Sequence, residues 1–185
     1  MIDVNDLRRG ATFTMDGELY KVLQYQHHKP GRGNAFIRTT LRNLRSGSTI
    51  QRTFASGERV QDIRVERRGV QYLYTDGDLY HFMDTETYDQ TALPAAMLDD
   101  QALYLKEGIE LVLATYEGEP LDVDLPTTVD MKVVEAEVQV AGDSATGTLK
   151  KITLETGLQV QVPLFVEVGD VVRVDTRTGT YVTRV

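Results

Sequence analysis

Residues 16–25 read DGELYKVLQY, a turn signal at Asp16-Gly17 followed by a run whose second half alternates apolar and polar side chains. A short run bounded by Asp-Gly in this way is typical of a strand that leaves a hairpin turn. Comparable apolar, aromatic or β-branched runs recur at residues 35–41, 70–74, 79–83, 131–140, 159–162 and 171–174. Turn dipeptides separate them: Ser46-Gly47, Ser56-Gly57, Asp76-Gly77, Thr156-Gly157 and Thr178-Gly179. Short strands with turns at this spacing indicate barrels or sandwiches, so the predicted fold is mainly β.

One segment predicts helix instead of strand. Residues 95–108 read AAMLDDQALYLKEG and follow Pro94, which suits the first position of a helix. Gly108 suits the position just after a helix end. We therefore expect one or two short helical turns between these two residues.

Two features of the sequence suggest domain boundaries. Residues 16–20, DGELY, recur as residues 76–80, DGDLY, which indicates either an internal duplication or two independent uses of a favourable turn. Pro126 interrupts the chain just before a long alternating run. The sequence predicts three domains, each near the size at which a small barrel is stable alone, at residues 1–64, 65–127 and 128–185.

Charge is distributed unevenly over these three predicted domains. The net formal charge is +5 for the first, -11 for the second and -2 for the third, which gives the -8 of the whole chain. No carboxylate occurs between Glu18 and Glu58, and this stretch holds Lys21, Lys29, Arg32, Arg38, Arg42, Arg45 and Arg52. A positive module on a negative body is typical of a local phosphate-binding surface, because the acidic part repels bulk nucleic acid. The alternative for Arg42 and Arg45 is an ordinary solvated face.

The composition is that of an ordinary soluble protein. The 185 residues are 41% hydrophobic and 26% charged and include no cysteine, which excludes disulfides, thiolate metal sites and cysteine nucleophiles. The first ten residues, MIDVNDLRRG, are too polar for a signal peptide, and no apolar run approaches the roughly 18 residues of a membrane span. We expect a cytoplasmic protein that does not bind membranes.

The stretch HHKPGRGNAF at residues 27–36 is the most distinctive part of the basic module. We expect Tyr25–His28 and Ala35–Thr40 to pair as a hairpin whose connection is formed by Lys29, Pro30, Gly31, Arg32, Gly33 and Asn34. Pro30-Gly31 suits the centre of a type II turn, which would place Arg32 at the apex without bulky neighbours. A guanidinium keeps its proton at neutral pH, so Arg32 can pair with phosphate, stack on a base or carry a modification, but it cannot be a general base. The alternative is an arginine on an ordinary surface turn.

Motifs for catalysis and metal binding are missing from the sequence. Adjacent residues of a strand point to opposite faces, so His27 and His28 do not predict a metal site. Asp84 and Glu86 lie two residues apart on a candidate strand and could form a carboxylate pair, although a solvated surface is the expected role in so acidic a segment. No GxSxG, P-loop or GxGxxG motif occurs. We predict a protein that is not an enzyme and that needs no metal or cofactor.

Longer segments match the motifs of one family from end to end. The segments KPGRGNAF (29–36), RTFASGE (52–58), VQYLY (70–74) and FMDTETY (82–88) are similar to the family motifs KPGKG or KLGRG, RTFxSGE, LQYLY and FMDxETYEQ. Residues 153–185, TLETGLQVQVPLFVEVGDVVRVDTRTGTYVTRV, are similar to the family's C-terminal signature nearly residue for residue. On these segments the chain resembles bacterial elongation factor P.

This resemblance implies an SH3-like (KOW-type) N-terminal barrel followed by two OB-fold barrels, in an L-shaped arrangement that imitates tRNA. It implies a monomeric translation elongation factor, not an enzyme, that binds both subunits of the 70S ribosome between the peptidyl-tRNA and exit sites and relieves stalling at consecutive prolines. The 29–34 loop would lie beside the CCA end of peptidyl-tRNA. The positive field for the tRNA backbone would come from Lys21, Arg38, Arg42, Arg45 and Arg52.

Two finer expectations also come from the resemblance. The family's tip residue is often a lysine that carries β-lysine or a related amine, and elsewhere an arginine that carries rhamnose, so Arg32 is the candidate target of a tip-modifying enzyme. Rhamnosylated members have a differently built loop, without Pro30-Gly31 before the arginine and Gly33 after it, and we therefore expect an unmodified Arg32. A second loop, which resembles over its first two residues the part that faces the mRNA at the exit-site codon, comprises Gly142, Asp143, Ser144, Ala145, Thr146 and Gly147.

Three alternatives stay open at this point. A free-standing OB-fold module for single-stranded nucleic acid would need stacking aromatics beside the basic groove, for which the candidates are Tyr20, Tyr25, Phe36 and Phe54. A hydrolase built on Asp84 and Glu86 would need a cleft and perturbed carboxylates. A close paralogue of elongation factor P within the translation apparatus is the third alternative.

Overall fold

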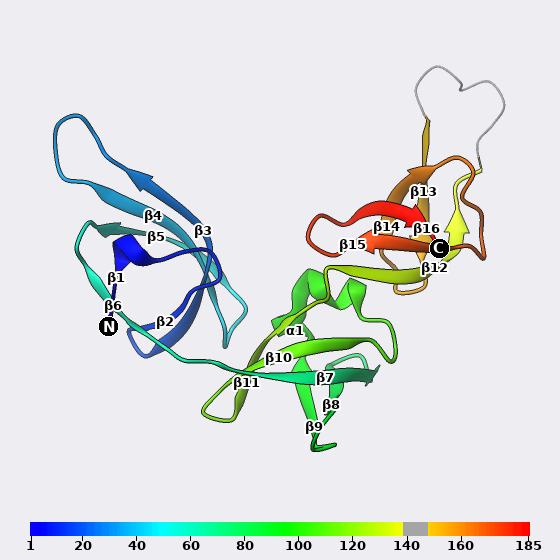
Figure 1. The fold of residues 1–185 in the computed structure, drawn as a ribbon, viewed down its shortest axis with the longest axis horizontal. Coiled ribbons are helices and arrows are strands. Elements are labelled where there is room, and N and C mark those ends of the chain that lie inside the picture. Colours follow the sequence, from blue (N-terminus) through cyan, green and yellow to red (C-terminus); the bar gives the residue numbers. More distant parts are fainter. Residues whose placement is uncertain (139–147) are drawn as a thin grey trace. The chain divides into compact units, whose positions relative to one another are not determined.

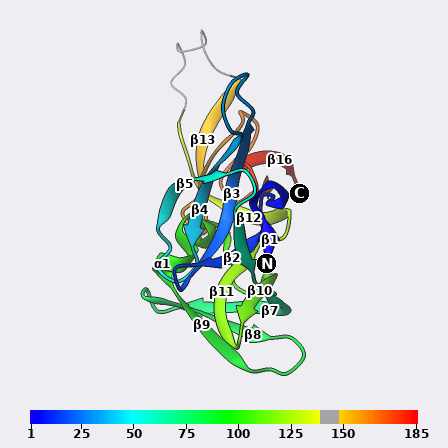
Figure 2. The same ribbon diagram turned by 90° about the vertical axis from the view of Figure 1, so that its left-hand side faces the viewer.

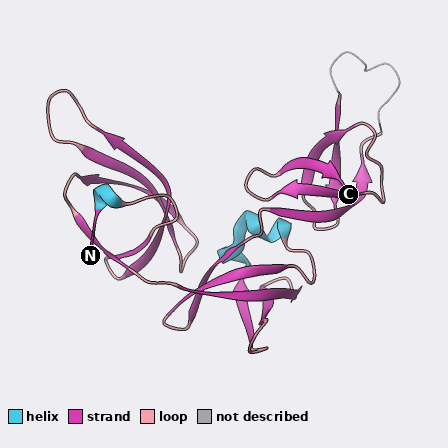
Figure 3. Cartoon of the chain, in the orientation of Figure 1, coloured by secondary structure: helices cyan, strands magenta, loops and turns pink. Residues whose placement is uncertain are grey.

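The computed structural model describes residues 1–138 and 148–185 and consists of three sheets with a few short helical segments (Figures 1 and 3). The predicted mainly β fold is therefore confirmed. The chain divides into two compact units. The first unit comprises Met1–Arg68, Leu93–Asp99 and Leu113–Val123, and the second comprises Gly69–Ala92, Asp100–Val112 and Asp124–Val185.

The first sheet has six strands in the order β1-β6-β2-β3-β4-β5. Its strands are β1 (Ile2–Asp3), β2 (Thr12–Met15), β3 (Glu18–His28), β4 (Phe36–Asn43), β5 (Thr49–Ala55) and β6 (Arg59–Asp62), with the 3₁₀ turn η1 (Val4–Asp6) after β1. Apolar residues of these strands point to one side and, together with Val4 and Leu7 from η1 and its C-cap, form a core. Its strand residues are Phe13, Val22, Ile37, Leu41, Phe54 and Val60. A register shift between Val22 and Gln24 marks a bulge in β3, the device by which a long strand bends around such a core.

The second sheet has five strands in the order β11-β10-β7-β8-β9. Its strands are β7 (Glu66–Thr75), β8 (Leu79–Asp84), β9 (Gln90–Pro94), β10 (Glu110–Tyr116) and β11 (Glu119–Asp124). The predicted helical turns lie between β9 and β10 as α1 (Ala95–Leu98) and the 3₁₀ helix η2 (Asp99–Tyr104). The short helical turns are confirmed, but Pro94 is the N-cap residue and not the first helical residue, and η2 ends four residues before Gly108.

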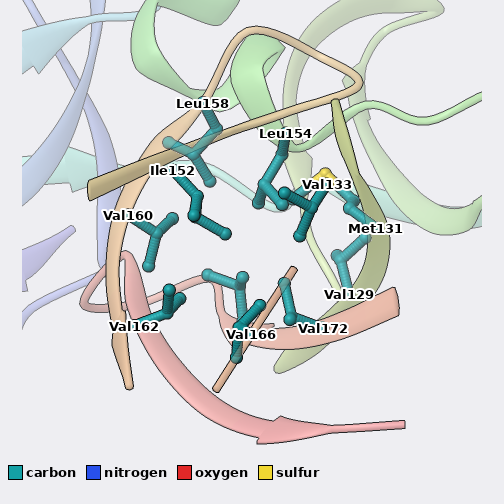
Figure 4. Packing of buried hydrophobic residues seen from close by; sticks show 11 residues of the cluster. Val129, Met131, Val133, Ile152, Leu154, Leu158, Val160, Val162, Val166 and Val172 are labelled. Atoms are coloured by element: carbon teal, nitrogen blue, oxygen red, sulfur yellow. The ribbon is translucent and has the colours of Figure 1, made fainter. Parts of the chain in front are cut away.

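The third sheet has five strands in the order β14-β13-β12-β15-β16. Its strands are β12 (Thr128–Ala136), β13 (Leu149–Leu154), β14 (Gln159–Pro163), β15 (Val171–Asp175) and β16 (Thr180–Arg184). The strand predicted at 131–140 thus starts three residues earlier and ends at Ala136. Figure 4 shows how Val129, Met131 and Val133 point into the interior, toward residues from the other strands and from the loop after β14.

The turn dipeptides differ in geometry although they look alike in sequence. Asp16 and Gly17 both have positive φ, 53° and 80°, and join Met15 to Glu18 as a two-residue hairpin turn. At Asp76-Gly77 only the glycine has positive φ, and the Asp76 carboxylate accepts the backbone N–H of Leu79 at 2.8 Å. The two DG corners are therefore different turns, which favours independent use of Asp-Gly over internal duplication.

Candidate nucleic-acid interface

The predicted hairpin between β3 and β4 is confirmed. Antiparallel pairs run from Tyr20 opposite Asn43 to His28 opposite Phe36, and residues 29–35 connect the two strands. Figure 2 shows this connection standing out beyond the other strands of its sheet. From Tyr20 to His28 the strand spans about 26 Å, so the connection is carried well away from the turn at Asp16-Gly17.

The tip loop holds Arg32 in the open, but its turn is not the predicted one. A type II turn centred on Pro30-Gly31 needs a positive φ at Gly31, and in the structure the positive φ, 107°, belongs to Gly33. Lys29, Arg32 and Asn34 are all exposed. Neither Lys29 nor Arg32 forms a hydrogen bond or ion pair with any residue in the described ranges. The tip thus presents two cations to solvent.

An aromatic pair closes the neck of the hairpin just below this loop. The rings of His28 and Phe36 are stacked with centroids 5.0 Å apart and planes 17° apart. Arg38 follows Phe36 on the same face of β4, and its Cζ lies 5.9 Å from the Phe36 ring centroid. His28 and Phe36 are the last cross-strand pair of the hairpin, so their stacked rings hold the two ends of the tip loop together.

The five cations expected to face the tRNA backbone do not form one surface. Arg38 lies opposite Gln26 of β3 and Thr53 of β5 in the strand register, on the outer face of the sheet. Arg52 lies opposite the buried Thr39 in the strand register, so its side chain is on the other face of the sheet from Arg38. It belongs to the edge strand β5, and its Cζ lies 5.7 Å from the centroid of the Phe54 ring. Both arginines are exposed and have no ion pair in the part of the chain that the structure describes.

Lys21, at the base of the hairpin, is held by a carboxylate of the acidic segment. Its Nζ lies 2.6 Å from Oδ2 of Asp122, and the two side chains are only 25% and 10% exposed. The other carboxylate oxygen of Asp122 accepts the backbone N–H of Val123 at 2.9 Å. This lysine therefore already has a well-placed partner inside the chain.

Arg42 and Arg45 are also engaged within the first compact unit. Nη2 of Arg42 donates to the carbonyl oxygen of Met97 at 2.7 Å. Nη1 of Arg45 donates to the carbonyl oxygen of Gly17 at 3.1 Å, and its Nε lies 3.4 Å from Oε1 of Glu119. A merely solvated face therefore does not describe Arg42, whereas Arg45, with 43% of its side chain exposed, makes its contacts at the surface.

Three family models match successive segments of the chain. The family models described as "Elongation factor P (EF-P) KOW-like domain", "Elongation factor P (EF-P) OB domain" and "Elongation factor P, C-terminal" match residues 3–60, 65–123 and 129–184. The chain belongs to the elongation factor P family. The predicted KOW-like N-terminal domain and the OB fold are thereby confirmed.

Relatives named "Elongation factor P" match the chain over its full length. The protein from Moorella thermoacetica is 52% identical over 184 residues, and that from Pelotomaculum thermopropionicum is 49% identical over 185 residues; each match covers 100% of both chains. A solved structure titled "Eukaryotic translation initiation factor 5A from Methanococcus jannaschii" has a TM-score of 0.50 at 23% identity and covers 66% of this chain and 92% of its own, a likeness of fold alone. Membership of the elongation factor P family supports a translation elongation factor that interacts with the ribosome, and its homologues are translation factors, not classical enzymes.

The carboxylate pair considered for a hydrolase does not form in this chain. β8 ends at Asp84, and Glu86 lies in the turn that follows, so the two residues do not share a strand face. Oδ1 of Asp84 accepts the backbone N–H of Glu86 at 2.8 Å and that of Thr87 at 3.0 Å. Asp84 therefore shapes the turn, and Glu86 is exposed.

The aromatics considered for single-strand binding are mostly occupied in packing. Phe54 is buried and Tyr20 packs against the same core. The Tyr25 hydroxyl donates to the carbonyl oxygen of Asn5 at 3.1 Å. Of the four candidates only Phe36 lies at the tip, and its ring is already stacked on His28. An open row of stacking platforms is thus missing from the described strands of the first sheet, which disfavours the free-standing single-strand module.

His27 and His28 pair with Ile37 and Phe36, adjacent residues of β4, which confirms that they point to opposite faces. Over residues 1–138 and 148–185 no group of three potential metal ligands is found. In the same ranges no helix is long and apolar enough to cross a membrane. The loop expected to face mRNA, residues 142–147, lies outside the described residues.

Sequence reasoning missed the residues that hold the base of the hairpin. Asp122 and Met97 lie 101 and 55 positions from the cations that they bind. The only signal was the excess of acidic residues in the middle of the chain, and that excess does not identify which carboxylate faces Lys21. The free tip and the engaged base emerge only from the folded chain.

Proposed function

We propose that this chain binds the 70S ribosome between the peptidyl-tRNA and exit sites, contacts both subunits, and promotes peptide bond formation at consecutive prolines. The observation that supports the proposal is the exposed Arg32, which is free of partners in the described part of the chain and stands at the end of a hairpin within a carboxylate-free stretch. The family to which the chain belongs supplies the context of translation elongation.

The tip loop acts by ordering the CCA end of peptidyl-tRNA. Proline fixes its own φ and lacks an N–H, so a prolyl chain end and a prolyl acceptor meet in poor geometry. Lys29 and Arg32 bind the phosphates of the CCA backbone, and the two glycines let the loop backbone approach closely. Holding the reactants in a productive arrangement lowers the entropic part of the barrier, while the ribosome performs the chemistry.

Contact with the tRNA backbone is divided unequally among the remaining cations. Arg38 and Arg52 have guanidinium groups that are free to reach phosphate. Lys21, Arg42 and Arg45 are engaged within the chain, so they contribute only to the long-range field. In this assignment the acceptor arm meets the tip half of the hairpin.

Several finer parts of the proposal concern other partners and the domain layout. Arg32 works unmodified, although it remains the residue that a tip-modifying enzyme would act on. The loop at residues 142–147 faces the mRNA at the exit-site codon. The chain acts as a cytoplasmic monomer with three domains, at 1–64, 65–127 and 128–185.

Replacement of Arg32 tests the function directly. We expect Arg32→Ala to slow synthesis through a Pro-Pro-Pro reporter about tenfold or more, because a charge-assisted hydrogen bond contributes about 1.5–3 kcal/mol. A proline-free reporter controls for general translation. Arg59→Ala controls for loss of charge, since Arg59 is an exposed arginine on β6 of the same sheet. Equal rates for wild type and Arg32→Ala on the proline template would refute the role of Arg32.

Intact mass spectrometry of protein from the native host tests the state of Arg32. We expect the mass of the unmodified sequence. An added mass that fragmentation places on Arg32, such as that of a deoxyhexose, would refute the bare arginine but would leave the function proposed for the loop in place.

A further inference from the structure

The base of the hairpin carries two like charges side by side. Lys21 of β3 and Arg42 of β4 are direct cross-strand partners on the outer face of the sheet. Like charges in this position destabilise a strand pair unless each finds a partner. Here the partners come from two other segments of the same compact unit, Leu93–Asp99 and Leu113–Val123.

The contact with Asp122 is fixed from both sides. Its carboxylate binds Lys21 at 2.6 Å and also accepts the N–H of Val123 at 2.9 Å, so the backbone of β11 sets the position of the carboxylate. Arg42 donates to the carbonyl oxygen of Met97, the third residue of α1, at 2.7 Å. Two neighbouring residues of the hairpin base are thus anchored to two separate elements.

A steric contact adds to these polar ones. The turn after β4 places Gly47 against α1, and a Cβ at this position would lie 2.7 Å from the carbonyl oxygen of Ala96. Gly47 also has a φ of +75°, which favours glycine. Close by in sequence, Leu44 is buried with Leu19 and Leu121 in a small cluster of its own. The hairpin base therefore packs closely against both segments.

We propose that these contacts form a positioning joint for the tip loop, with Asp122 as its central positioning residue. From Lys21 to His28 the strand spans about 23 Å, so a tilt of about 10° at the base would move the tip by about 4 Å. Misplacement of a reacting group by even about 1 Å can cost about 100-fold in rate. The inference rests on the function proposed for Arg32, because the joint determines where that arginine points.

Distance measurements on the free protein test the joint without reference to translation. The chain has no cysteine, so Asn34→Cys in the tip loop and Glu117→Cys in the turn between β10 and β11 give two unique spin-label sites within the first unit. We expect a narrow label-to-label distance distribution in the otherwise unchanged protein. In Gly47→Ala and in Asp122→Asn we expect a shift or broadening of about 4 Å.

A matched glycine separates the joint from ordinary backbone strain. Gly57 has a φ of +90° and open space around it, so Gly57→Ala carries the same conformational penalty without the clash at Ala96. We expect Gly57→Ala to leave the distribution unchanged. Exchange of the two charges, Lys21→Asp with Asp122→Lys, restores an ion pair and should restore the narrow distribution that Asp122→Asn loses.

The joint is refuted if Gly47→Ala and Asp122→Asn, both folded by circular dichroism, give the same distribution as the unchanged protein. Should Gly47→Ala fail to fold, Asp122→Asn and the charge exchange decide the outcome. On the Pro-Pro-Pro reporter we expect Asp122→Asn to lower the activity several-fold with Arg32 intact, and the charge exchange to recover it. If adding the wild-type protein does not speed synthesis of the Pro-Pro-Pro reporter, the proposed function is refuted. The distance measurements would still decide whether the joint exists.

Discussion

Salt dependence of RNA binding would count the cations that the hairpin offers to phosphate. Each neutralised phosphate steepens the slope of log K against log salt by about 0.7–0.9. Seven cations lie in the carboxylate-free stretch, which would give a slope of about -5 to -6. Three of them bind other groups of the chain. The cations that remain for phosphate are Lys29, Arg32, Arg38 and Arg52, so we expect a slope of about -3 to -4.

Two arginines of the same strand provide the matched pair of variants. Arg38 and Arg42 lie four residues apart on the outer face of β4, but only Arg42 is bound, to the carbonyl oxygen of Met97. We expect Arg38→Gln to reduce the slope by about 0.7–0.9 and Arg42→Gln to leave it nearly unchanged. The assay is fluorescence anisotropy of a labelled RNA minihelix ending in CCA, titrated with protein at several KCl concentrations.

Two outcomes of this titration would contradict the expectation that only four cations bind phosphate. A wild-type slope of about -5 to -6 would show that the internal contacts of Lys21, Arg42 and Arg45 open to receive phosphate. Equal effects of Arg38→Gln and Arg42→Gln would show that the distinction between free and engaged cations has no consequence for binding.

Two further predictions concern structure and titration. Hydrogen bonding from Arg177 lowers the pKa of Asp175 to about 2 from its usual 3.8, so the stabilisation from this carboxylate is present above about pH 4 and is lost as the pH falls through about 2. In Arg177→Gln, carboxyl NMR titration should show the pKa of Asp175 returning toward 3.8. An unchanged pKa would contradict the role given to Arg177. Thr39 is buried and its hydroxyl donates to the carbonyl oxygen of Arg52 at 2.9 Å. Thr39→Val should therefore lower the free energy of unfolding by about 1 kcal/mol and speed amide exchange along β5. Thr53 is exposed, so the control Thr53→Val should do neither.

Local signals in the sequence were sufficient for the hairpin and for the direction of its side chains. The tip residues lie between two runs whose strand period and turn residues are all read within about twenty positions. The opposite directions of His27 and His28 follow from the same period of two. The helical turns after Pro94 were predicted from one proline and one glycine, but their end was not, because η2 stops at Tyr104 and no residue of the segment marks that position.

Turn geometry and long-range contacts could not be read in this way. Pro30-Gly31 is compatible with several turns, and only the folded loop shows that Gly33 takes the positive φ. Arg38 and Arg52 belong to different strands, so their faces depend on the register between β4 and β5, which a local pattern does not contain. Asp122 and Glu119 were counted as part of a repulsive acidic body, whereas they bind Lys21 and Arg45.

The acidic middle of the chain therefore has a second consequence besides repulsion of bulk nucleic acid. Asp122 and Glu119 offset the charges of Lys21 and Arg45 at the base of the hairpin. Arg42 keeps its charge but is bound by the carbonyl oxygen of Met97, so the unengaged cations of the hairpin lie in its tip half. In the described part of the hairpin, the cations without such a contact are Lys29, Arg32 and Arg38, which lie in its tip half. Binding confined to one end of a hairpin with an anchored base is directional, and direction is what a factor needs if a single arginine is to meet the end of a tRNA.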